Sequence, residues 1–306
     1  MVSVMPSPLP ASFSLLQSVI LGLEIFLYCG GIGACAWSAW LTWRGLLPRR
    51  LSPWQADVTD FALGFLAVAA GAVGGQFALA WVGSRLTADP DLQLLIGGSG
   101  FQAGMLAGAV LAGVLIRRRI AEEAIAGEAI PAEATEMAAA GNRCGSIGGM
   151  LRAAAQGVIT LVAAIPLVGL SSFAWEAVLE ASGHAIAKQD LVRIFAKGGS
   201  PLLVVAMTFF AVVVAPLTEE LVFRAGLFRF LHRRMAPWAA MLVTSVVFAS
   251  LHNMNVAALV PLCVLGMVLA FAYERTGNIL VPVIAHALFN LNTIILLLAG
   301  LGPPSP

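Results

Sequence analysis

The sequence has few charged residues. Of its 306 residues, only 11% are Asp, Glu, Lys or Arg, whereas 59% are hydrophobic, and the mean hydropathy is +0.91. A typical soluble domain carries about 25% charged residues. The chain therefore lacks the polar surface of a water-soluble fold, and the composition predicts a membrane protein whose main partner is the lipid bilayer. A net charge of +1 gives no electrostatic basis for a nucleic-acid partner, and we expect none.

Cysteine is also scarce, and its spacing carries no chemistry. The chain has four cysteines without a CxxC pair or the spacing of metal ligands, so neither a disulfide framework nor a zinc finger is predicted. The first 14 residues contain no Lys or Arg. The beginning of the sequence therefore lacks the positively charged region of a secretory signal peptide.

Long apolar runs dominate what is present. A helix needs about 20 apolar residues to cross the hydrocarbon core of a bilayer. Eight runs approach this length, the sixth being the shortest: 15–43, 61–83, 94–116, 154–174, 201–223, 237–253, 256–273 and 279–300. We predict an all-α fold, a polytopic membrane bundle of about eight transmembrane helices. Residues 1–196 would form an N-terminal four-helix membrane region with a cytoplasmic linker at 117–152, and residues 197–306 a separate C-terminal module.

The basic residues between these runs predict the orientation of the chain. Cytoplasmic loops carry an excess of Lys and Arg. If the N-terminus lies outside, 13 of the 17 Lys and Arg residues fall in cytoplasmic loops. The Ala/Gly-rich composition favours a bacterial source. We therefore expect an integral protein of a bacterial inner (cytoplasmic) membrane with its N-terminus outside.

The last third of the chain places polar side chains inside apolar runs. Such residues are costly at membrane depth, and they mark functional sites by default. Three of the last four runs contain them, and they supply our candidate site residues: Glu219, Glu220, Arg224, His252, His286 and Asn290.

Helical spacing relates these groups to one another. His286 and Asn290 are four residues apart, so they share a helix face. Glu220 can pair with Arg224 at the same spacing. Glu219 is turned by about 100° from Glu220, so only one of the two needs that partner and the other is free to face a polar cavity.

The depth of these groups in the bilayer is predicted to match. The runs that carry Glu219 and His252 are antiparallel around a turn near Ala236. Glu219 lies 17 residues before this turn and His252 lies 16 after it. At about 1.5 Å per residue the two side chains end at nearly equal height, and His286 on the last run can reach the same level.

Together these groups can support several kinds of chemistry. A glutamate can act as a general base toward water, with a histidine to orient the water or move its proton. A second histidine and an amide can donate hydrogen bonds to a developing oxyanion. These are the parts that a hydrolase of peptide bonds requires. Alternatively, one glutamate and two histidines can bind Zn²⁺, or the buried titratable groups can form the proton relay of a transporter.

The order of these motifs resembles that of a known family. The pattern EExxxR, then FxxxH, then HxxxN on successive membrane helices is similar to the CPBP family, which comprises CAAX prenyl proteases (type II CAAX endopeptidases, also called Abi) and bacteriocin-processing enzymes. The resemblance covers about residues 197–300. It implies an intramembrane endopeptidase that hydrolyses a peptide bond of a membrane-associated protein or peptide.

The resemblance also implies roles for the candidate residues. Glu219 would activate water and His252 would be its partner. His286 and Asn290 would stabilise the oxyanion. Glu220 and Arg224 would hold the geometry of their helix.

The same resemblance bears on the cofactor and the substrate, and other functions remain beside it. The sequence lacks HExxH, and we expect no obligatory metal, with zinc bound by Glu219, His252 and His286 as the alternative. The substrate would be a protein or peptide, prenylated or not. A non-catalytic membrane scaffold or immunity protein and a proton-coupled transporter remain as other functions, although residues 1–196 hold no second copy of the motifs, as the paired repeats of many transporters would.

Overall fold

The computed structural model describes residues 13–51, 54, 56–125, 146–184, 201–252 and 256–301. Within these residues every regular element is helical. Seven segments are long enough to span a membrane: α1 (Leu15–Trp43), α2 (Val58–Leu86), α3 (Pro90–Ile125), α5 (Ile147–Ala181), Pro201–His232, α11 (Val256–Thr276) and α12 (Leu280–Leu298). One further apolar helix, α10 (Pro237–Ser250), is shorter than a membrane span. It corresponds to the sixth apolar run, which is the shortest in the sequence. The prediction of an all-α polytopic bundle is confirmed, and the chain is an integral membrane protein.

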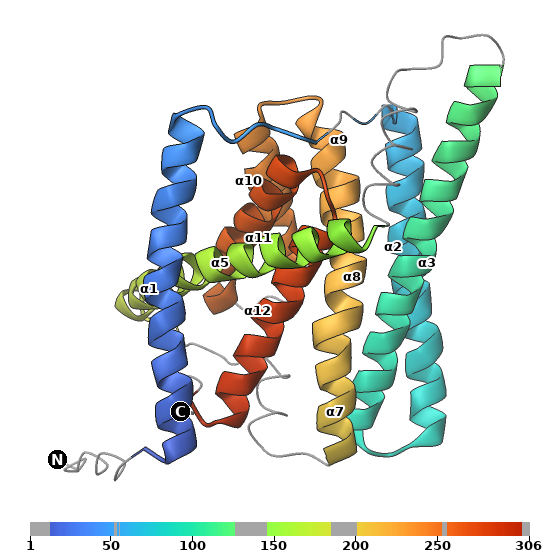
Figure 1. The fold of residues 1–306 in the computed structure, drawn as a ribbon. Helices are drawn as coiled ribbons and strands as arrows, with labels where there is room; N and C mark the ends of the chain where they lie inside the picture. The colour runs from blue at the N-terminus through green and yellow to red at the C-terminus, as the bar shows by residue number, and fades with distance from the viewer. Residues whose placement is uncertain are drawn as a thin grey trace.

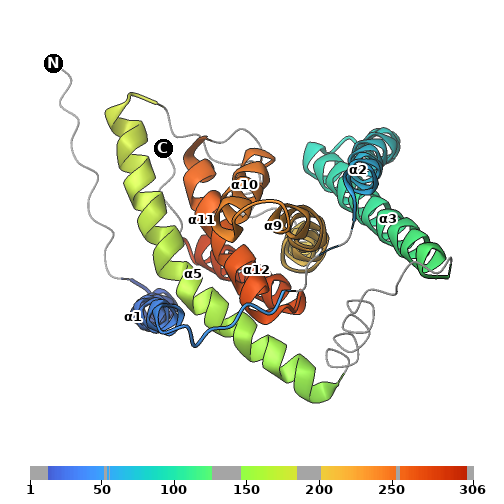
Figure 2. The same cartoon turned by 90° about the horizontal axis from the view of Figure 1, so that it is seen from above.

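Helix α5 runs crosswise to α1 (Figures 1 and 2). The two helices cross at glycines. A Cβ atom added at Gly31 would lie 2.2 Å from the carbonyl oxygen of Val162, and one added at Gly169 would lie 1.8 Å from the hydroxyl of Tyr28. Small residues allow helices to approach closely in lipid, where apolar surface alone does not drive them together.

Helices α2 and α3 form a tight hairpin beside the rest of the bundle (Figure 2). Their contact is made by glycines on both sides. A Cβ atom added at Gly104 would lie 1.9 Å from the carbonyl oxygen of Gly71, and one added at Gly75 would lie 2.2 Å from that of Gly100. The backbones therefore touch directly.

The segment Pro201–His232 is not a uniform α-helix. It consists of α7 (Pro201–Phe209), the π-helical segment η1 (Phe210–Val214), α8 (Ala215–Glu220), a second π-helical segment η2 (Leu221–Phe228) and α9 (Arg229–His232). In η1 the N–H of Ala215 donates to the carbonyl of Phe210, five residues back. π-Helical turns inside α-helices are often found at functional sites.

Several helix ends rich in arginine lie on one side of the bundle. Arg233, after α9, donates to the carbonyl of Trp54 in the α1–α2 connection at 3.1 Å. Arg49 of the same connection pairs with Glu274 near the end of α11 at 3.1 Å. Arg119 of α3 pairs with the carboxylates at the start of α2. These helix ends lie in segments that the distribution of Lys and Arg predicts to be on one side of the membrane.

The N-terminal and C-terminal regions, whose boundary is predicted near residue 196, share a hydrophobic core. Helix α5 packs on α12, where a Cβ atom added at Gly157 would lie 2.7 Å from Ile284. A buried cluster joins α5 to α11 and α12 and contains Ala164, Val168, Leu265, Leu269 and Ala285.

The predicted linker at 117–152 is helical at both of its ends, since α3 continues to Ile125 and α5 begins at Ile147. Residues 126–145 lie outside the described part of the chain.

Candidate active site

The two adjacent glutamates lie on α8, between the π-helical segments. Glu220 is fully buried and Glu219 is 9% exposed. Arg224, in η2, is also fully buried. Ionised side chains are rarely buried without partners, so the neighbours of each group decide what it can do.

Glu220 is held in an ion pair. Its Oε1 lies 2.7 Å from Arg224 Nη1 and 2.9 Å from His286 Nδ1. Arg224 also donates to the carbonyl of Gly266 on α11 at 3.3 Å, and its guanidinium lies 4.5 Å from the ring centroid of Phe248. The predicted i,i+4 pair is therefore present, and it ties this helix to α11 and α12. Both contacts of Glu220 are made by Oε1, and its Oε2 is buried without a hydrogen-bond partner among the described residues.

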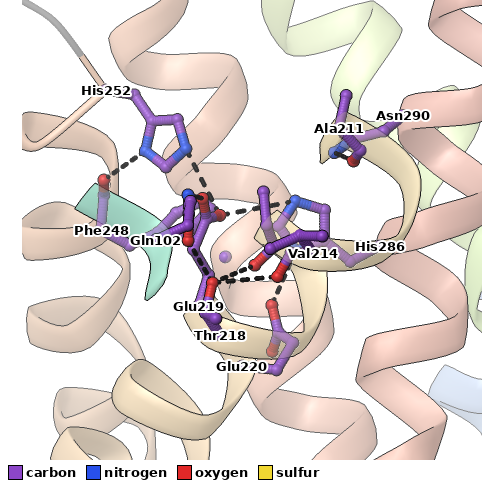
Figure 3. A network of polar contacts seen from close by, with 12 residues as sticks. Gln102, Ala211, Val214, Thr218, Glu219, Glu220, Phe248, His252, His286 and Asn290 are labelled. Atoms are coloured by element: carbon purple, nitrogen blue, oxygen red, sulfur yellow. Dashed lines mark hydrogen bonds and ion pairs between the residues drawn. The ribbon is translucent and has the colours of Figure 1, made fainter. Parts of the chain in front are cut away.

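Glu219 faces a different direction, toward the Nε2 atoms of two histidines (Figure 3). Its Oε2 lies 3.6 Å from His252 Nε2 and 3.9 Å from His286 Nε2. His252 follows α10 and His286 lies on α12. Three groups from three parts of the chain thus meet at one carboxylate oxygen, as the estimate of their depths predicts.

The hydrogen-bond partner of each imidazole ring determines which of its nitrogens carries the proton, and therefore whether the nitrogen that faces Glu219 has a lone pair. His252 Nδ1 lies 2.8 Å from the carbonyl oxygen of Phe248, which can only accept. His286 Nδ1 likewise meets a carboxylate oxygen of Glu220. Each Nδ1 therefore carries the proton, and in a neutral ring Nε2 is an acceptor. Both distances to Glu219 exceed a direct hydrogen bond. A water molecule between these groups would donate one proton to Glu219 and one to a histidine.

Asn290 satisfies a carbonyl group that the helix leaves unpaired. Its Nδ2 donates to the carbonyl oxygen of Ala211 in η1 at 2.8 Å. In the register of η1 that oxygen would accept from the N–H of residue 216, which is a proline and has none. One of the two amide hydrogens of Asn290 is thus engaged by the backbone of η1.

Sequence reasoning did not single out two polar residues that touch Glu219 or its neighbour. Gln102 of α3 donates from Nε2 to Glu219 Oε1 at 3.3 Å. Thr218 donates from its hydroxyl to Gln102 Oε1. The available signal was weak: Gln102 is the one side-chain amide in the apolar run 94–116, and an uncharged group in a glycine-rich helix does not stand out.

The candidate residues do not form a metal centre as they stand. No group of three or more His, Cys, Asp or Glu side chains suited to a metal ion occurs in the part of the chain that the structure describes. Two ligands of a tetrahedral zinc ion lie about 3.3 to 3.4 Å apart, since each bond is about 2.0 to 2.1 Å long. The separations of 3.6 and 3.9 Å at Glu219 are wider. We therefore derive no chemical step through a metal.

Comparison with known proteins agrees with the motifs. The family described as "Type II CAAX prenyl endopeptidase Rce1-like" matches residues 201–292. Residues 201–292 are therefore similar to the CPBP family. The matched CPBP segment contains all six candidate residues, whereas Gln102 lies before it.

Three curated relatives are similar to part of the chain. The protein named "Putative membrane peptidase YdiL" from Bacillus subtilis is 32% identical over 96 residues, which is 31% of this chain and 37% of the relative. An "Uncharacterized 24.3 kDa protein" from Escherichia coli is 30% identical over 33% of this chain and 48% of its own length. The "UPF0177 protein YxdF" from Lactococcus lactis is 30% identical over 26% and 43%, respectively. The chain thus spans less than half the length of these three relatives. No solved structure matches it.

Proposed function

We propose that the protein is an intramembrane endopeptidase that uses water activated by Glu219 to hydrolyse a peptide bond of a membrane-associated protein or peptide. One observation carries the proposal. Of two adjacent carboxylates, Glu220 is fixed by Arg224 and His286, while Oε2 of Glu219 meets the Nε2 atoms of two histidines. The match to the CPBP family supports it.

The proposed reaction begins with a proton transfer from water. Glu219 Oε2 takes one proton as the water oxygen attacks the carbonyl carbon of the peptide, and His252 Nε2 accepts a hydrogen bond from the second water proton. The resulting oxyanion accepts a hydrogen bond from the second hydrogen of Asn290 Nδ2, and from His286 when that ring carries both protons. Glu219 then gives its proton to the peptide nitrogen, the C–N bond breaks, and a carboxylic acid and an amine leave.

The remaining expectations belong to the same proposal. The substrate is a protein or peptide at the bilayer, prenylated or not, and no metal is obligatory, with Zn²⁺ on Glu219, His252 and His286 as the alternative. The enzyme resides in a bacterial inner membrane with its N-terminus outside.

Cleavage in liposomes tests the proposal. Purified protein is reconstituted with prenylated and unprenylated reporter peptides, and wild type is compared with Glu219→Gln, His252→Ala and the exposed control Glu180→Gln. We expect cleavage by wild type and by the control. Loss of the base in Glu219→Gln should lower kcat by about 10²- to 10⁴-fold. Cleavage that survives Glu219→Gln would overturn the mechanism. Parallel reactions with a chelator, and with Zn²⁺ restored, decide whether a metal is required.

A proton-coupled transporter is the second candidate. It is favoured by the chain of titratable groups that runs from His252 through Glu219 and His286 to Glu220 inside the bundle. A pH-sensitive dye inside the same liposomes tests it. Proton flux abolished by Glu219→Gln, together with no peptide cleavage by wild type, would favour the transporter. Neither activity in a folded protein would favour a non-catalytic scaffold or immunity protein.

A further inference from the structure

We propose that Gln102 is a positioning residue that orients the carboxylate of Glu219, so that the α2–α3 hairpin completes the active site from outside the matched region. This inference rests on the proposed function of Glu219. Gln102 lies 117 positions from Glu219 in the sequence and before the CPBP match at 201–292. The N-terminal region thereby gains a specific task in the reaction.

The geometry of α3 aims Gln102 at α8. Gly100 and Gly104 face α2, where their backbones touch Gly75 and Gly71. Gln102 is two residues from each of these glycines, which places it about 200° around the helix on the opposite face. That face meets α8, and the amide of Gln102 lies between Thr218 and Glu219 (Figure 3).

The polarity of the contacts fixes how the amide is turned. Gln102 Nε2 donates to Glu219 Oε1, and Gln102 Oε1 accepts from the hydroxyl of Thr218. The opposite orientation would place the amide oxygen against an ionised carboxylate oxygen. The Thr218 hydroxyl also lies 3.0 Å from the carbonyl oxygens of Val214 and Ala215, which compete with Gln102 for its single proton, and the residue is fully buried. When that proton is donated to Gln102, Thr218 holds Gln102, and Gln102 holds Glu219.

This contact separates the roles of the two oxygens of Glu219. With Oε1 bound to Gln102, rotation of the carboxylate is restricted, and Oε2 is the oxygen that faces His252 and His286. A general base must lie within hydrogen-bond reach of the proton that it removes. A displacement of about 1 Å in such a site can lower the rate on the order of 100-fold. Orientation by Gln102 therefore bears directly on proton transfer.

The hairpin is a rigid support for this residue. Direct backbone contact through five glycines leaves α2 and α3 little freedom to slide past each other: Gly71, Gly75, Gly100, Gly104 and Gly108. Sites are held more precisely by packed helices than by loops. An amide inside a membrane helix also needs a partner, because lipid offers none.

The kinetic test uses Gln102→Leu, which keeps the size of the side chain and removes both hydrogen bonds. We expect kcat for peptide cleavage in liposomes to fall on the order of 10- to 100-fold, with KM changed by less than about twofold, because an orientation effect acts on the transition state and not on substrate binding. Ser99→Ala is the matched control, since its hydroxyl donates to the carbonyl of Ile96 in its own helix. An unchanged kcat in Gln102→Leu overturns the inference.

Variants of Thr218 test the relay. Thr218→Val should lower kcat, and the double variant with Gln102→Leu should be no slower than Gln102→Leu alone, because Thr218 acts through Gln102. Thr218→Ser keeps the hydroxyl and should restore the rate. If the fold losses in kcat of the two single variants multiplied in the double variant, Thr218 would not act through Gln102.

A measurement that does not depend on peptide cleavage separates this inference from the proposed function. Thermal unfolding of Gln102→Leu, Glu219→Leu and the double variant in detergent gives the coupling between the two side chains. We expect the double variant to lose less Tm than the sum of the single variants, and additive losses would show that Gln102 does not hold Glu219. If wild type cleaves no peptide, the proposed function fails, while this cycle still decides whether the pairing exists.

Discussion

At the scale of single residues, the site depends on two neighbouring glutamates with different surroundings. Glu220 is fully buried and binds a guanidinium and an imidazole through one oxygen. Glu219 binds an amide through one oxygen and faces two histidines with the other. A turn of about 100° between adjacent helical residues produces this difference. One carboxylate therefore stabilises the fold, and the other is available for chemistry.

Substitution separates these two roles. Glu220→Gln leaves the guanidinium of Arg224 without a counter-charge, and breaking a buried pair in this way costs about 3 to 5 kcal/mol. We expect a clear fall in Tm for Glu220→Gln. Glu219→Gln should keep a near-wild-type Tm and lose cleavage. Thermal unfolding in detergent beside the liposome assay checks both, with Glu180→Gln as control. Equal Tm losses for both glutamate variants would contradict the division.

At the scale of elements, Pro216 and Asn290 compensate for each other across two helices. Pro216 cannot donate to the carbonyl of Ala211, and Asn290 of α12 donates to it instead. This hydrogen bond is partly buried, and such a bond contributes about 0.5 to 1.5 kcal/mol. The π-helical segment before the glutamates is thus stabilised by a side chain from another helix.

A double-variant cycle tests this compensation. Asn290→Ala should lower stability by about 0.5 to 1.5 kcal/mol, because Ala211 loses its donor. Pro216→Ala supplies an N–H at residue 216, so Asn290→Ala should cost less in that background. Unfolding in detergent measures all four proteins. Equal losses in both backgrounds would show that Asn290 does not serve this carbonyl.

The glycine contact between α2 and α3 makes a second prediction at this scale. Gly104→Ala places a Cβ atom 1.9 Å from a backbone oxygen of Gly71, so the hairpin must open, and overpacking of this kind costs about 1 to 3 kcal/mol. Gly98→Ala is the matched control on the same helix, because a Cβ atom there meets nothing within 4 Å. We expect a lower Tm for Gly104→Ala and an unchanged or higher one for Gly98→Ala. The same Tm in both variants would contradict the close contact.

At the scale of the whole molecule, one side of the bundle joins segments that are distant in sequence. The N–H groups of Arg50 and Leu51 donate to the carbonyl of Glu274, and Arg49 pairs with its side chain. The α1–α2 connection is thus fixed to the end of α11. The arginines of these ends share a side, as the positive-inside pattern requires.

Cysteine labelling tests the orientation that we propose for the membrane. In a cysteine-free background, Ala88→Cys between α2 and α3 and Arg118→Cys near the end of α3 introduce thiols at exposed positions. With the N-terminus outside, a membrane-impermeant maleimide added to intact cells should label Ala88→Cys and leave Arg118→Cys unlabelled until the membrane is broken. The reverse pattern would invert the topology.

The sequence by itself determined the helices and the local pairs. Apolar runs and their length depend on composition over about 20 neighbouring residues, and pairs such as Glu220 with Arg224 depend only on the helical repeat. Both can therefore be predicted before any tertiary contact is known. The meeting of Glu219 with His252 could also be predicted, because a single turn joins their helices and fixes their relative depth.

Only the tertiary structure decided the contacts between distant helices. Gln102 meets Glu219 across 117 positions, Asn290 meets Ala211 across 79, and His286 meets Glu220 across 66. The crosswise course of α5 belongs with them (Figure 2). Hydropathy and periodicity describe one helix at a time, whereas the partner of a polar group depends on which helices pack together and on how each is rotated about its axis.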